Sequence, residues 1–213
     1  MSEFLLQDNQ TIVFAGDSIT DCGRRHDHAP YGEGYVHRTI ELITARYPSL
    51  SLRYTNAGIG GNTVTDLKNR WQDDVLRHQP DWVTIKIGIN DLHRSLNGGE
   101  HAIPPEKFEE DYRDILVRTR NAGAQIVLID PFYLSTDPYA DSHRNRVLQF
   151  LPEYLDVVHR LSAEFDTYNV RTQDLFEEQL SFRPPDYFCP EPVHPYTSGH
   201  IVIAHGLLQA WEW

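Results

Sequence analysis

Apolar segments of two kinds alternate along the chain. Short runs rich in β-branched residues are separated by longer segments in which apolar residues recur with the period of an α-helix. The short runs predict strands at residues 11–15, 52–55, 82–87 and 125–130 and around residue 168. The longer segments predict helices over residues 34–47, 64–78, 104–121, 145–165 and 197–211. Because a helix follows each predicted strand, the pattern indicates a parallel sheet with helices on both faces.

Two local features support this assignment. The continuous apolar run IVLI, at residues 126–129, is typical of a strand buried on both faces. Thr197 or Ser198 is placed to cap the last helix, which begins directly after the segment HPY. We therefore expect a three-layer α/β/α sandwich of flavodoxin-like type around a five-stranded parallel sheet, with residues 1–213 forming a single domain.

Small polar or glycine-rich segments follow the first three predicted strands. They are GDS, GGN and GIND, at residues 16–18, 60–62 and 88–91. In a doubly wound sheet the ligand site lies beyond the carboxyl ends of the strands, so we expect these segments to converge there. Ser18 would be exposed on a tight turn between a strand and a helix. The N–H of Gly61 and the side-chain amide of Asn90 are suitable donors for an oxyanion hole.

A serine hydroxyl becomes nucleophilic at neutral pH only with an adjacent base, and an acidic group fixes the tautomer of that base. The segment PEPVHP, at residues 190–195, offers both groups. We predict His194 as the base and Glu191 as the acid, on a loop restricted by its prolines. Asp186 is a second candidate for the acid. A third alternative is that a backbone carbonyl alone orients His194.

Each candidate residue also has a structural interpretation. Ser18 can cap the helix that follows it, and the glycine pair can form a tight turn or a phosphate nest. No lysine follows the glycines in the pattern of a nucleotide-binding loop. Asn90 can bond locally in a turn, and for Asp91 we prefer the interpretation that it caps a short helix. For Ser18, Gly61 and Asn90, the joint occurrence of the three segments favours a catalytic role.

The segments GDSIT, GIGGNT, GIND and VHP occur in the order that is typical of the SGNH (GDSL-type) hydrolase family, which this chain resembles. The stretches GDSITDCGR, GNTVTDLKNRW, PDWVTIKIGIND and PFY resemble the bacterial acetylxylan esterase branch. The resemblance implies an SGNH hydrolase fold and a serine esterase that removes acetyl groups from xylan-derived sugars through an acyl-enzyme. It assigns the oxyanion hole to the N–H groups of Ser18 and Gly61 and the amide of Asn90, with His194 as general base. The family pattern has Asp where this chain has Glu191.

Composition narrows the choice of partners. The net charge of −12 disfavours nucleic acids and anionic lipids and favours a neutral or weakly polar substrate. A small acylated carbohydrate, the substrate class that the resemblance implies, is consistent with this charge. No apolar run approaches the roughly 20 residues that span a bilayer, and the first ten residues lack the basic segment of a signal peptide. We therefore expect a cytoplasmic protein with no membrane partner. Cys22 and Cys189 are the only cysteines and lack the spacing of a zinc site, so we expect reduced thiols. No set of acidic residues and histidines marks a metal site, and acyl transfer through a serine requires no cofactor, so we expect neither.

The aromatic tail WEW, at residues 211–213, predicts burial against another subunit, and relatives in the acetylxylan esterase branch form homo-oligomers. Asp17 is expected to support the serine turn, while Arg70 and Arg94 are expected to edge the cleft. Two other functions stay open. The same catalytic groups can process other short-chain esters, thioesters or lysophospholipids, and Glu191 alone favours a catalytically silent carbohydrate-binding relative.

Overall fold

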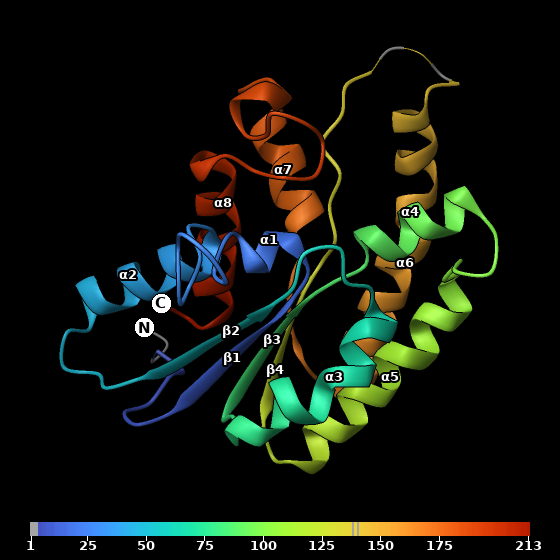
Figure 1. Ribbon diagram of the computed structural model, residues 1–213. Helices are drawn as coiled ribbons and strands as arrows, with labels where there is room; N and C mark the ends of the chain where they lie inside the picture. The colour runs from blue at the N-terminus through green and yellow to red at the C-terminus, as the bar shows by residue number, and fades with distance from the viewer. Residues whose placement is uncertain (1–3, 138, 140) are drawn as a thin grey trace.

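The computed structural model describes residues 4–137, 139 and 141–213. Its strands form one sheet in which every neighbouring pair is parallel (Figure 1). The strand order is β2-β1-β3-β4-β5, which is the flavodoxin-like order and confirms the expected fold class. The strands are β1 (Thr11–Gly16), β2 (Arg53–Gly58), β3 (Trp82–Lys86), β4 (Gln125–Ile129) and β5 (Tyr168–Val170).

Helices cover both faces of this sheet and complete the three layers (Figure 1). One layer contains α1 (Ser18–Asp21), α2 (Tyr35–Arg46), α7 (Thr172–Leu180) and α8 (Thr197–Ala210). The other contains α3 (Val64–Asp74), α4 (Ile89–Asn97), α5 (Pro105–Asn121) and α6 (His143–Phe165). The buried apolar residues between these layers form one continuous core. None of the helices in the described part of the chain is both long and apolar enough to cross a bilayer.

The central strands are buried on both faces, as their apolar sequences predict. Every residue of β1 and β3 is buried, whereas the edge strands β2 and β5 are partly exposed. This arrangement is expected for a parallel sheet, because crossover helices pack on both of its faces. One polar residue in this region is unusual, since Lys86 ends β3 and is fully buried.

Several elements differ from those predicted. The short helices α1 and α7 were not predicted, because short elements contain too few turns to show a helical period. The helix predicted over residues 64–78 ends at Asp74, and the 3-10 helix η1 (Leu76–His78) follows it. The predicted cap of the last helix is wrong. Tyr196 occupies the N-cap of α8 without a side-chain hydrogen bond, and the Ser198 hydroxyl donates to the Tyr187 carbonyl at 2.7 Å.

The aromatic tail packs against its own chain, so the expectation that another subunit covers it is wrong. Trp211 is fully buried, and its ring lies edge-on to Phe14 and Trp82, with centroid distances of 6.4 and 6.0 Å. The guanidinium of Arg46 lies 4.6 Å from the ring centroid of Trp213. These contacts join the end of the chain to β1, β3 and α2.

Burial of His200 in α8 links the stability of the fold to pH. Its Nδ1 atom accepts the Tyr35 N–H at 3.2 Å, and its Nε2 atom lies 3.4 Å from the Cys22 sulfur. Burial lowers the pKa of His200 to about 4. Because the unfolded chain then binds this proton more readily, the stabilisation from neutral His200 is complete above its ordinary pKa and is lost as pH falls toward 4.

We expect His200→Asn to weaken this dependence, because asparagine retains an acceptor without a proton that titrates in this range. Between pH 7 and pH 4.5, the unfolding free energy of the native protein should fall about 2 kcal/mol further than that of the variant, at about 1.4 kcal/mol per pKa unit. Urea unfolding at the two pH values measures this difference, and the comparison removes the contributions of other titrating groups. Parallel losses in the two proteins would contradict the assignment.

Candidate active site

Ser18 lies on the tight turn that joins β1 to α1. Gly16 ends β1, and a Cβ atom there would come within 2.5 Å of the Lys86 carbonyl oxygen, so the turn requires glycine. The Asp17 side chain caps α1 by accepting the Ile19 N–H at 3.0 Å. Because Asp17 provides the cap, the Ser18 hydroxyl is available to another partner.

That partner is His194, which lies 176 positions further along the chain. Its Nε2 atom is 2.8 Å from Ser18 Oγ. Its Nδ1 atom is 2.5 Å from Glu191 Oε1. Serine, imidazole and carboxylate are thus joined in the order in which an acid orients a histidine toward a nucleophile.

The Glu191 carboxylate folds back on its own loop. Oε1 also accepts the His194 N–H at 2.8 Å, and Oε2 accepts the Val193 N–H at 3.0 Å. Asp186, the other candidate acid, is exposed on the 3-10 helix η2 (Pro185–Tyr187), and no hydrogen bond joins it to His194 in the described part of the chain. The structure therefore brings Glu191, and not Asp186, to the histidine.

Gly61 presents its backbone beside the serine turn. Its φ is +78°, a conformation that favours glycine. The neighbouring N–H groups have acceptors, since Gly60 donates to Asp21 Oδ2 at 3.1 Å and Asn62 donates to the Ile59 carbonyl at 3.2 Å. Among the described residues, no acceptor pairs with the Gly61 N–H. This group is therefore available to an oxyanion.

Asn90 lies in the first turn of α4. Its Nδ2 atom donates to the Asn62 carbonyl at 3.0 Å. An amide nitrogen carries two hydrogens, so one remains for a ligand while the other fixes the side chain. The structure thus brings Ser18, Gly61 and Asn90 to one rim of the sheet, at the ends of β1, β2 and β3.

Arg70 and Arg94, which were expected at the edge of the cleft, form hydrogen bonds with this rim. Arg70 donates to the Asn62 side chain and to the Ala57 carbonyl, both at 2.8 Å. Arg94 donates to the Gly61 carbonyl at 3.3 Å. Both contacts hold the GGN segment in place, so these side chains position the candidate oxyanion donors.

Asp91 has a different role from the expected helix cap. Gly88, with φ of 134°, occupies the N-cap of α4, while Asp91 lies inside the helix. Its Oδ1 atom accepts the Val64 N–H at 3.0 Å and so binds the first turn of α3. Burial raises the pKa of Asp91 to about 8. This carboxyl therefore joins α3 to α4 beneath the candidate site.

His93, which follows Asn90 by one helical turn, was not among the residues predicted from the sequence. Its ring lies edge-on to Tyr133 at 5.9 Å and 6.0 Å from the ring of His143. Burial lowers its pKa, and the nearby imidazole of His143 lowers it further. The signal available in the sequence was the spacing of three residues from Asn90, which places both side chains on the same helix face.

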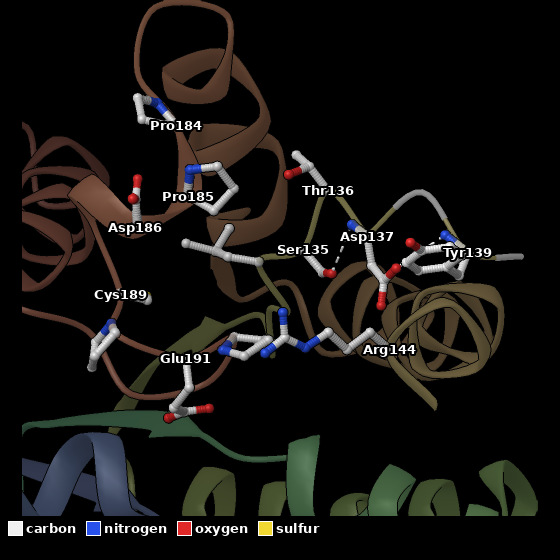
Figure 2. A pocket seen from close by; sticks show the side chains of 13 residues that line it. Ser135, Thr136, Asp137, Tyr139, Arg144, Pro184, Pro185, Asp186, Cys189 and Glu191 are labelled. Atoms are coloured by element: carbon white, nitrogen blue, oxygen red, sulfur yellow. Dashed lines mark hydrogen bonds between the residues drawn. The ribbon is translucent and has the colours of Figure 1, made fainter. Parts of the chain in front are cut away.

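A pocket of about 540 Å³ opens beside the Glu191 loop (Figure 2). Glu191 and Pro192 form part of its wall, and Cys189 lies at its buried side. Within residues 4–137, 139 and 141–213, no group of three or more His, Cys, Asp or Glu side chains has the geometry of a metal site.

The fold and the serine-histidine-carboxylate geometry define the class of serine hydrolases. The model of the GDSL-like lipase/acylhydrolase family matches residues 14–201. An acetylxylan esterase from Geobacillus stearothermophilus is 35% identical over 214 residues, which cover 96% of this chain and 95% of the relative.

Solved structures agree with this match. A crystal structure of an acetylxylan esterase from Geobacillus stearothermophilus superposes with a TM-score of 0.89 at 34% identity, covering 98% of this chain and 97% of that one. An α/β hydrolase from the metagenome of Lake Arreo, Spain, has a TM-score of 0.88 at 29% identity, covering 99% and 98% of the two chains. This chain therefore belongs to the GDSL-like lipase/acylhydrolase family and is a carboxylic ester hydrolase, as its sequence predicted.

The contact between Glu191 and His194 leads to a test of the acid. We expect Glu191→Ala to lower kcat on the order of 10³-fold, because the imidazole loses the group that fixes its tautomer. The matched control is Asp186→Ala, which should retain near-native kcat. Steady-state hydrolysis of a small aryl acetate measures both, and a larger loss in the Asp186 variant would reverse the assignment.

Proposed function

We propose that this protein removes acetyl groups from sugar esters, with acetylated xylo-oligosaccharides as the substrate class. Ser18 is the nucleophile, His194 the general base and Glu191 the acid. The observation that carries this proposal is the hydrogen-bonded chain from Ser18 Oγ through both ring nitrogens of His194 to Glu191. The full-length similarity to an acetylxylan esterase supports the choice of substrate.

Acyl transfer then proceeds in two steps. As Ser18 Oγ attacks the ester carbonyl, its proton passes to His194 Nε2, and Glu191 stabilises the imidazolium through Nδ1–H. The oxyanion accepts hydrogen bonds from the Ser18 N–H, the Gly61 N–H and the second Nδ2 hydrogen of Asn90. His194 next donates its proton to the sugar oxygen as the C–O bond breaks. Water repeats the sequence on the acyl-enzyme and releases acetate.

Glutamate at the acid position is compatible with this mechanism. Other solved structures of the Geobacillus stearothermophilus esterase are catalytic mutants in which a serine, an aspartate or a histidine is replaced by alanine. Here the longer side chain reaches the histidine because its carboxylate is held by the N–H groups of Val193 and His194. This contact supports an active enzyme over a catalytically silent carbohydrate-binding relative.

We further propose that residues 1–213 act as one domain, that copies of the chain form a homo-oligomer, and that the protein is cytoplasmic. The continuous core supports the single domain. Exposed aromatic rings near the catalytic loop, Phe182, Tyr187 and Tyr196, support association of copies. The two unpaired thiols, Cys22 and Cys189, support a reducing compartment.

The nucleophile can be tested directly. We expect Ser18→Ala to lose hydrolysis of a small aryl acetate by at least about 10³-fold while unfolding at the same urea concentration as the native protein. A sulfonyl fluoride should label the native protein once, at Ser18, and should leave the variant unlabelled. Near-native turnover by a folded variant would remove Ser18 from the mechanism.

Acyl length separates acetyl esterase activity from the broader alternatives. We expect kcat/KM to fall at least about tenfold from acetate to butyrate esters of the same alcohol, because each added methylene that lacks space costs about 1 kcal/mol or more. A series of aryl esters with two to eight acyl carbons measures this. A flat or rising profile would favour a general short-chain esterase, thioesterase or lysophospholipase.

A further inference from the structure

The pocket beside the Glu191 loop contains groups that the mechanism does not use. Its wall includes Ser135, Thr136 and Asp137 from the segment after β4, Arg144 from the first turn of α6, and Asp186 from η2 (Figure 2). Its volume of about 540 Å³ is within the range of about 300–1,000 Å³ that is usual for ligand sites.

Arg144 has no partner of opposite charge in this pocket. Figure 2 shows its side chain extending from α6 across the pocket toward the Glu191 loop. No ion pair or hydrogen bond ties its guanidinium to another of the described residues, although Asp137, Asp186 and Glu191 line the same pocket. Its donors are therefore available to hydroxyl oxygens of a ligand, and the exposed Asp186 carboxylate is available as an acceptor, whereas the Glu191 carboxylate is bound to His194 and Val193.

The pocket also offers an aromatic surface. Tyr139 lines its outer edge and is 75% exposed, the highest value among the large apolar side chains of the described chain. A flat ring beside hydroxyl and charged groups suits a pyranose, which has apolar C–H faces and a polar rim. The net charge of the lining is negative, so a neutral polyhydroxylated ligand fits better than an anionic one.

The pocket lies beside Glu191, and this position indicates which part of the substrate enters it. The leaving sugar oxygen must lie within hydrogen-bond reach of His194 Nε2 to receive its proton. The sugar that carries the ester therefore lies over the loop of Glu191 and His194. The pocket adjoins this loop, since Glu191 lines the pocket and its carboxylate contacts His194.

We propose that this pocket is the subsite for the sugar units next to the acetylated one, with Arg144 as the residue that determines specificity for oligosaccharide esters. This inference rests on the proposed function. It assigns the leaving-group side of the substrate to a defined set of residues, and it separates recognition of the sugar chain from hydrolysis of the acetyl group.

The test compares two acetyl esters in three proteins. The variant is Arg144→Ala, and the matched control is Arg146→Ala, an exposed arginine of α6 that lies outside the pocket. The substrates are a small aryl acetate, which has no neighbouring sugar units to occupy the pocket, and an acetylated xylo-oligosaccharide. We expect Arg144→Ala to raise KM for the oligosaccharide about tenfold, with kcat and the aryl acetate rates unchanged. The control should match the native protein on both substrates.

Inhibition by an unacetylated xylo-oligosaccharide provides a second readout that needs no turnover of the sugar ester. We expect this compound to inhibit aryl acetate hydrolysis by the native protein, and the inhibition constant to rise about tenfold in Arg144→Ala. Tyr139→Ala should raise it as well, because the ring offers packing surface to the sugar.

The outcomes separate this inference from the function on which it rests. If the native protein hydrolyses the aryl acetate but not the acetylated oligosaccharide, the proposed substrate class is wrong. If it hydrolyses both and the Arg144 variant keeps the native ratio of KM values, the subsite alone is overturned. Equal losses on both substrates would also overturn it, because Arg144 would then act on the reacting groups or the fold.

Discussion

The site depends on three parallel strands that end level with one another. Gly16 of β1 pairs in register with Gly58 of β2 on one side and with Lys86 of β3 on the other. Neither glycine leaves room for a side chain, since a Cβ atom would come within 2.2 Å of a neighbouring atom in each case. The loops after these strands therefore begin at the same height and in close contact. This register brings a hydroxyl, a backbone N–H and a side-chain amide to one place.

Much of this arrangement could be predicted from the sequence, because its signals lie in short segments next to the predicted strands. The segments GDS, GGN and GIND each follow an apolar run directly, so the topology of a doubly wound sheet predicts where they meet. The sequence favoured Glu191 as the acid, because it lies three residues before His194, but it left Asp186 as an alternative. Glu191 and Asp186 lie on the same proline-rich loop, and only its folded path brings one carboxylate to the histidine. The course of the aromatic tail could not be predicted from the sequence either, because Trp211 is buried by contacts with β1 and β3, which are far from it in the sequence.

Buried charges lie directly beneath the serine turn. Burial lowers the pKa of Lys86 and raises that of Asp17, while the attraction between the two groups opposes both shifts. The Lys86 ammonium lies 4.6 Å from the ring centroid of Phe132, so a π-face replaces part of its lost hydration. These groups are fixed within the core, and the turn above them is held by Asp17 through its cap on α1. The serine turn is therefore held by groups in the core as well as by the contacts of the turn itself.

The loop of Glu191 and His194 carries both the proposed acid and the proposed base, and the Glu191 carboxylate is bound by N–H groups of that same loop. With glutamate at this position, the imidazole still lies 2.8 Å from Ser18 Oγ. A sequence signature that requires aspartate three residues before the histidine would not detect this chain, although its Glu191 carboxylate is in contact with the imidazole.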